Sequence, residues 1–247
     1  MAFSDKDLEL MGTIIAKYPR KRSAIMPLLH YVQSVSGYVT EAGIEKIAEL
    51  LELSTAEVTA VSTFYTQYKP HPVGEYHVGV CINTLCAVMG GDQIYDEVSK
   101  HLGIGNDEVT ADGKVSLERI ECNAACDYAP VVMVNWEFYD NQTPESVKAL
   151  VDGARAGNPK GPTRGPKKLR TWKENSAVLA GISDGLANEG PSAGKASLLG
   201  WMSSSTTFKS KTMRWGTLNS KLTIHSTRKA SEFGGSTTFS SPTPMSH

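Results

Sequence analysis

A strand-like run followed by two cysteines occurs twice in the chain, at residues 76–86 (YHVGVCINTLC) and at residues 115–126 (VSLERIECNAAC). In the first run apolar residues alternate with polar or small ones, which is typical of a half-buried strand. The two pairs are all the cysteines of the 247-residue chain: Cys81, Cys86, Cys122 and Cys126. Because neighbouring strands of a sheet lie about 5 Å apart, loops at two strand ends can bring four sulfurs to one centre.

Four chemistries compete for these cysteines. Buried free thiols are common in protein cores, but they do not explain two close pairs that both follow strands. A redox disulfide needs one pair and leaves the other unexplained. Structural zinc takes four thiolates, usually from short C-x2-C turns, whereas the spacing here is C-x4-C and C-x3-C. A two-iron cluster takes two thiolates at each iron, which matches two loops with two cysteines each. We therefore favour the cluster and keep zinc as the alternative.

The residues before the first strand predict a helical bundle, which we assign to residues 1–72. Apolar residues recur there at helical spacing, and Ser54 with Glu57 forms a capping-box signature. We expect helices at residues 5–17, from a cap at Ser23 to Gly37, at residues 41–51, and from Ser54 to near Tyr68.

Residues 73–157 predict a small domain that mixes strands and helices. Thr143 and Pro144 are a strong helix start, because Thr caps well and Pro is tolerated in the first helical turn. We expect strands at residues 76–81, 115–120, 131–134 and 136–139, and helices at residues 94–102 and from Pro144 to near Gly157. The fold class predicted for the chain is therefore α+β.

We predict that residues 158–247 form a long irregular tail. Ser, Thr, Gly and Pro make up 41 of the 87 residues in the range 161–247, too polar a composition to bury a core of its own. That range has a net charge of +8, against −9 for residues 1–160. We expect the tail to lie on partner subunits or to be disordered, with Trp172, Trp201 and Trp215 as anchors in neighbouring subunits.

Several classes of protein are excluded at this stage. No stretch of 18 apolar residues occurs, so we expect no membrane span. The first ten residues are acidic and do not resemble a secretory signal. The basic residues of the tail are diluted by Ser and Gly, and no nucleic-acid-binding motif accompanies them, so we expect no nucleic-acid partner. We expect a cytosolic chain whose cysteines are reduced or bound to metal.

The motifs around the cysteines resemble those of the thioredoxin-like [2Fe-2S] ferredoxin subunit (E-type) of NADH-quinone oxidoreductase, the respiratory complex I. The resemblance covers residues 8–156. Its further motifs are YPRKRSA at residues 18–24, LLH at 28–30, VSTFYT at 61–66, APVV at 129–132 and NQTPE at 141–145. One departure is visible: Ala124 stands in the middle of the C-x3-C loop, where the family usually has glycine.

The resemblance implies a thioredoxin-like domain at residues 73–157 with one [2Fe-2S] cluster held by Cys81, Cys86, Cys122 and Cys126. It implies a subunit of an oxidoreductase that has no complete active site or catalytic residue of its own. FMN and NADH would sit on a partner flavoprotein subunit, and a second iron–sulfur subunit would be a neighbour. Asp127 and Tyr128, after the last cysteine, would either tune the cluster's potential or cover it.

The resemblance also implies a position at the inner face of the cell membrane, held there through the complex. It leaves two other functions open. The same module occurs in the diaphorase subunits of NAD-linked hydrogenases and formate dehydrogenases. The alternative from a different class is a zinc-stabilised assembly module without a redox role.

Overall fold

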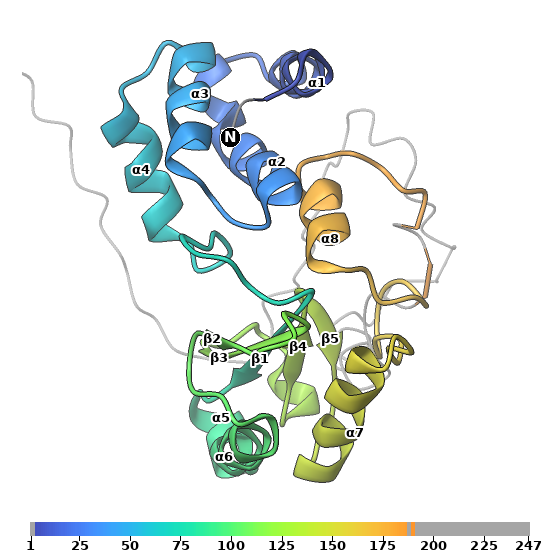
Figure 1. Cartoon of the computed structure of the whole chain (residues 1–247). Coiled ribbons are helices and arrows are strands. Elements are labelled where there is room, and N and C mark those ends of the chain that lie inside the picture. Colours follow the sequence, from blue (N-terminus) through green and yellow to red (C-terminus); the bar gives the residue numbers. More distant parts are fainter. Residues whose placement is uncertain (1–2, 187–188, 191–247) are drawn as a thin grey trace, which may run out of the picture. The chain divides into compact units, whose positions relative to one another are not determined.

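The computed structural model describes residues 3–186 and 189–190 (Figure 1). Its helices are α1 (Asp5–Ile15), α2 (Ile25–Ser36), α3 (Glu41–Leu51), α4 (Thr55–Phe64), α5 (Thr84–Val88), α6 (Gly91–Leu102), α7 (Pro144–Arg155) and α8 (Trp172–Leu179). Its strands are β1 (Tyr76–Cys81), β2 (Glu108–Val109), β3 (Val115–Ile120), β4 (Val132–Val134) and β5 (Glu137–Tyr139). The predicted α+β class is confirmed. In this part of the chain no helix is long and apolar enough to cross a membrane.

The five strands form one sheet in the order β2-β3-β1-β4-β5. β1 and β3 run parallel, in a register that places Cys81 opposite Ile120. β4 pairs antiparallel with β1, and β5 antiparallel with β4. A parallel pair needs a crossover, which here runs through α5 and α6. The carboxyl ends of β1 and β3 therefore meet at one edge of the sheet.

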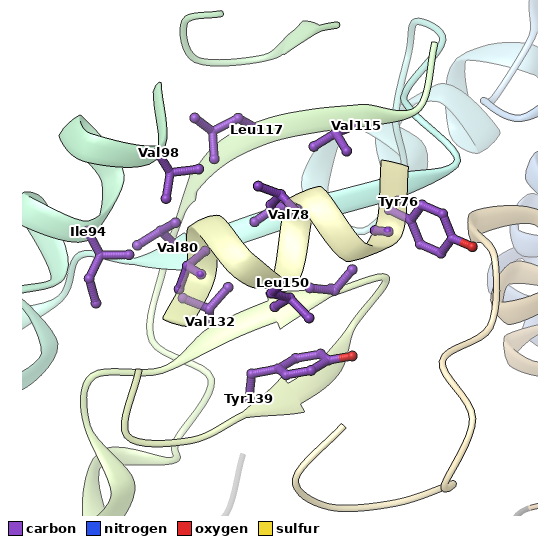
Figure 2. Packing of buried hydrophobic residues seen from close by; sticks show 14 of the residues in the cluster. Tyr76, Val78, Val80, Ile94, Val98, Val115, Leu117, Val132, Tyr139 and Leu150 are labelled. Carbon is purple, nitrogen blue, oxygen red and sulfur yellow. The ribbon is translucent and has the colours of Figure 1, made fainter. Parts of the chain in front are cut away.

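Alternate residues of β1 face opposite sides of the sheet, as the pleat requires. Tyr76, Val78 and Val80 pack in one core cluster with residues of α6 and α7. Figure 2 shows Ile94 and Val98 of α6 and Leu150 of α7 against the strand residues. This side of the sheet is the main apolar core of the predicted strand domain.

The opposite side of β1 carries Cys81. Cys81 and Cys86 belong to a second cluster of buried residues, together with Ile120, Ala125, Val131 and Met133. Trp136 and Phe138 pack against this cluster. One face of the sheet thus packs only the apolar core, and the other face packs the cluster that contains Cys81 and Cys86.

The first four helices, α1 to α4, which we call the lead-in helices, have a core of their own. Its centre includes Leu28, Leu29 and Val32 of α2, all fully buried. The predicted capping box at Ser54 is present. The predicted cap at Ser23 is wrong: residues Lys21–Ala24 form a 3-10 turn, and α2 begins at Ile25 without a side-chain cap. The chain turns once more before the helix starts, so Ser23 lies inside that turn.

α8 lies within the range assigned to the tail from the sequence. It packs on α2, and Trp172 is only 2% exposed. The Trp172 ring nitrogen donates to the carbonyl of Gly37 at 2.7 Å. The expectation that Trp172 anchors a neighbouring subunit is therefore wrong, because its own chain covers it. Trp201 and Trp215 lie outside the described residues, and the division at residues 72 and 157 remains a prediction.

Replacing Trp172 with alanine should lower the free energy of unfolding by about 3–5 kcal/mol, because it removes a large buried ring. Urea unfolding followed by circular dichroism measures the change. Leu179→Ala in the same helix is the control, because Leu179 is 39% exposed; it should cost less than about 1 kcal/mol. Equally small effects for both variants would show that α8 is not part of the fold.

Candidate metal centre

The four cysteines come from two loops at the same edge of the sheet. Cys81 ends β1, and Cys86 lies in the short helix α5. Cys122 lies in the loop after β3, and Cys126 opens a 3-10 turn that ends at Tyr128. The backbone N–H of Ile82 donates to the carbonyl of Ile120 at 3.3 Å, so the pairing of the two strands continues into the loops.

Asn83 joins the two loops through its side chain. Its amide nitrogen donates to the Glu121 carboxylate at 2.6 Å, and its oxygen accepts from the backbone N–H of Cys122 at 2.8 Å. Asn83 thus fixes the second loop to the first, directly beside a cysteine of each pair. The sequence does not predict this role of Asn83, since an asparagine between two cysteines gives no sign of a partner 39 residues away.

The thiols interact within and between the pairs. Cys122 and Cys126 have their sulfurs 3.5 Å apart. Burial raises the pKa of the Cys81 thiol to about 11, and the hydrogen bond with Cys86 and the charges of Cys86 and Cys122 add to the rise. The hydrogen bond with Cys122 raises the pKa of Cys126, to which Cys81 also contributes. None of the four cysteines forms a disulfide. The pKa shifts of Cys81 and Cys126 each depend in part on a cysteine of the other pair.

The two cysteine pairs supply four sulfur donors from two neighbouring loops. A two-iron cluster requires two thiolates at each iron, and two neighbouring cysteine pairs supply that set. Metal binding would release the protons that the raised pKa values of Cys81 and Cys126 keep in place.

The two pairs differ in exposure. Cys81 and Cys86 are 2% and 3% exposed, whereas Cys122 and Cys126 lie at the surface. Helix α6 approaches the buried pair closely at Gly91, where a Cβ atom would lie 2.5 Å from the Cys81 carbonyl oxygen. The site therefore has a closed side, where the sheet and the start of α6 cover Cys81 and Cys86, and an open side, where Cys122 and Cys126 reach the surface.

A protein-family model described as thioredoxin-like [2Fe-2S] ferredoxin matches residues 11–155. The chain belongs to this family. Membership implies one [2Fe-2S] cluster, which confirms the cofactor predicted from the cysteine spacing, and it confirms the thioredoxin-like fold. That the four cysteines are its ligands remains a prediction.

Two curated relatives are both named as subunits of an NADH-quinone oxidoreductase. The E-type subunit of the NADH-quinone oxidoreductase of Mycobacterium tuberculosis is 59% identical over 177 residues, 72% of this chain and 70% of the relative. The subunit numbered 2 of the NADH-quinone oxidoreductase of Thermus thermophilus is 40% identical over 160 residues, 64% of this chain and 88% of the relative.

Among solved structures, the chain is similar to an NAD+-reducing [NiFe]-hydrogenase in the air-oxidized state. The alignment covers 55% of this chain and 23% of the hydrogenase chain. The sequence identity is 18% and the TM-score 0.49. A TM-score this low does not establish a shared fold.

The departure at Ala124 has a structural cost. Ala124 has φ +55°, in the left-handed region that favours glycine, and its N–H donates to the Cys122 sulfur at 3.3 Å. The loop thus needs this backbone conformation to direct an N–H at a cysteine, and the methyl group of alanine opposes it.

Ala124→Gly should therefore raise the free energy of unfolding by about 1 kcal/mol, because it relieves the left-handed strain. Ala125→Gly is the matched control. Ala125 has φ −110° and is 4% exposed, so glycine there should destabilise the chain. Urea titrations of both variants measure the free energy of unfolding. A loss of stability in Ala124→Gly as large as in the control would show that Ala124 is not strained.

Proposed function

We propose that this chain is the electron-transfer subunit of an NADH-quinone oxidoreductase and carries one [2Fe-2S] cluster for single-electron exchange with the FMN of a partner flavoprotein subunit. One observation carries the proposal: the only two cysteine pairs of the chain meet where β1 and β3 end side by side. The names of the relatives support the assignment to this oxidoreductase.

In this proposal Cys81, Cys86, Cys122 and Cys126 are the ligands. The cluster supplies one-electron chemistry, which complements the two-electron chemistry of a flavin. The chain itself contributes position and shielding. Asn83 fixes the two loops to each other, and Val131 and Met133, 2% and 3% exposed, keep water from the closed side.

The oxidation of NADH would take place on the partner, with this chain as one part of an enzyme that has several subunits. We propose the FMN- and NADH-binding flavoprotein and a neighbouring iron–sulfur subunit as its contacts. The chain would sit on the cytoplasmic side and reach the membrane through the assembled complex. A diaphorase subunit of a hydrogenase or formate dehydrogenase would use the same site, and identification of the subunits in the purified complex separates these functions.

Replacing any one of the four cysteines with serine should bleach the visible absorption of the purified chain and lower its iron content. The physical reason is that one of the two irons loses one of its two cysteine thiolates. Absorption, iron and acid-labile sulfide analysis, and paramagnetic resonance of the reduced protein measure the loss.

Thr84→Ser is the control, because Thr84 is an exposed neighbour of the first pair and should keep the full spectrum. Four cysteine variants that all retain two irons per chain would refute the ligand assignment. A colourless wild-type chain containing zinc would instead establish the zinc-stabilised assembly module.

A further inference from the structure

A segment after the sheet crosses back over β5. We call residues 160–164 the strap. The backbone N–H of Thr163 donates to the carbonyl of Phe138 at 2.8 Å, and the hydroxyl of Tyr139 donates to the carbonyl of Lys160 at 2.5 Å. The strap lies beyond residue 155, where the match to the family model ends. It is thus an addition to the matched domain that lies on the strand carrying Phe138.

The strap ends in a nearly buried ion pair. Arg164 donates to both oxygens of Asp140, from Nε at 2.9 Å and from Nη2 at 2.6 Å. The two side chains are only 12% and 9% exposed. Such a two-point contact fixes the plane of the guanidinium group as well as its position.

That plane lies over two aromatic rings next to the cysteines. The guanidinium carbon is 4.6 Å from the ring centre of Phe138 and 5.3 Å from that of Tyr128. Phe138 packs against the cluster of buried residues that contains Cys81 and Cys86. Tyr128 ends the turn that Cys126 opens. Arg164 therefore contacts one ring that packs against the buried cysteine pair and one ring in the turn that begins at Cys126.

The charge of Arg164 also acts on carboxylates near the cysteines. The hydrogen bond with Asp140 raises the pKa of Arg164, and the charges of Asp140 and Asp127 add to the rise. Asp127 directly follows Cys126. The guanidinium group is thus a positive charge that acts on Asp140 and on Asp127, the residue next to Cys126.

We propose that Arg164 is a positioning residue for the cluster, which clamps the Cys126–Tyr128 turn and balances the carboxylates of Asp127 and Asp140. The inference rests on the proposed function, since it needs a cluster to act on. Reduction adds a negative charge to a cluster, so nearby carboxylates lower its potential and a nearby cation raises it. A largely buried cation is screened weakly by water and salt.

Four variants of the full chain test the proposal. Arg164→Gln removes the charge and the clamp together. Arg164→Lys keeps the charge but loses the planar fork and the stacking. Asp140→Asn removes a carboxylate and weakens the clamp. Arg170→Gln is the matched control, because Arg170 is a buried arginine of the same region whose partners are Glu137 and Asp184. Each chain is reconstituted with iron and sulfide. The midpoint potential and the rate of cluster loss to a chelator are then measured.

We expect Arg164→Gln to lower the potential and to speed cluster loss about tenfold, as for other groups that orient metal ligands. Arg164→Lys should keep the potential near that of the wild type and still lose the cluster faster. Asp140→Asn should raise the potential. Arg170→Gln should change both readouts less than Arg164→Gln does.

The opposite signs for Arg164→Gln and Asp140→Asn separate this role from a loss of stability, which would move both variants in the same direction. Equal effects of Arg164→Gln and Arg170→Gln, or shifts of the same sign for Arg164→Gln and Asp140→Asn, would overturn the inference. If Arg164→Gln does not fold, the contrast between Arg164→Lys and Asp140→Asn decides it. A wild-type chain that takes up no cluster would refute the proposed function itself.

Discussion

The parallel pairing of β1 with β3 is the constraint on which the metal centre depends. Its register places Cys81 opposite Ile120, so the loop with Cys122 starts beside the first cysteine pair. A slip of one residue would turn every side chain of a strand to the other face. Cys81 would then point toward α6 and α7, and Val80 would replace it on the cysteine side. The main core and the metal centre are therefore specified by the same register.

A polar network on the cysteine side of the sheet supports that register. His77 of β1 contacts Ser116 at 2.9 Å and Glu118 at 2.7 Å, both on β3. Lys69, just before the strand domain, pairs with the same carboxylate at 2.5 Å. Burial lowers the pKa of His77, and Lys69 brings a positive charge to the Glu118 carboxylate. A buried network of this kind tolerates no slipped pairing, because its polar groups would lose their partners.

Local patterns predicted the elements whose stability is local. The helix at Glu41–Leu51 and the capping box at Ser54 follow from apolar spacing and cap residues a few positions apart. The cysteine loops were predicted because each pair follows a strand. The sequence also suggested that loops at two strand ends could bring the pairs together, but the register that pairs Cys81 with Ile120 is visible only in the folded chain.

The elements that were missed depend on partners far along the chain. α5 has only five residues, too few to show a helical period. α8 buries Trp172, Asn175 and Ser176, of which two are polar, so no apolar stripe marks it. The roles of Asn83 and Arg164 likewise come from Glu121 and Asp140, which only the folded chain brings near.

The packing of α8 on α2 also has a consequence for how the chain is made. Ala180, just after α8, is part of the core of the lead-in helices, and Lys17 donates to the carbonyl of Gly181 at 2.8 Å. A ribosome completes α4 long before it reaches these residues, and at usual rates the interval is roughly ten seconds. The nascent lead-in helices thus keep an apolar face uncovered for the whole time in which the metal-binding domain is synthesised.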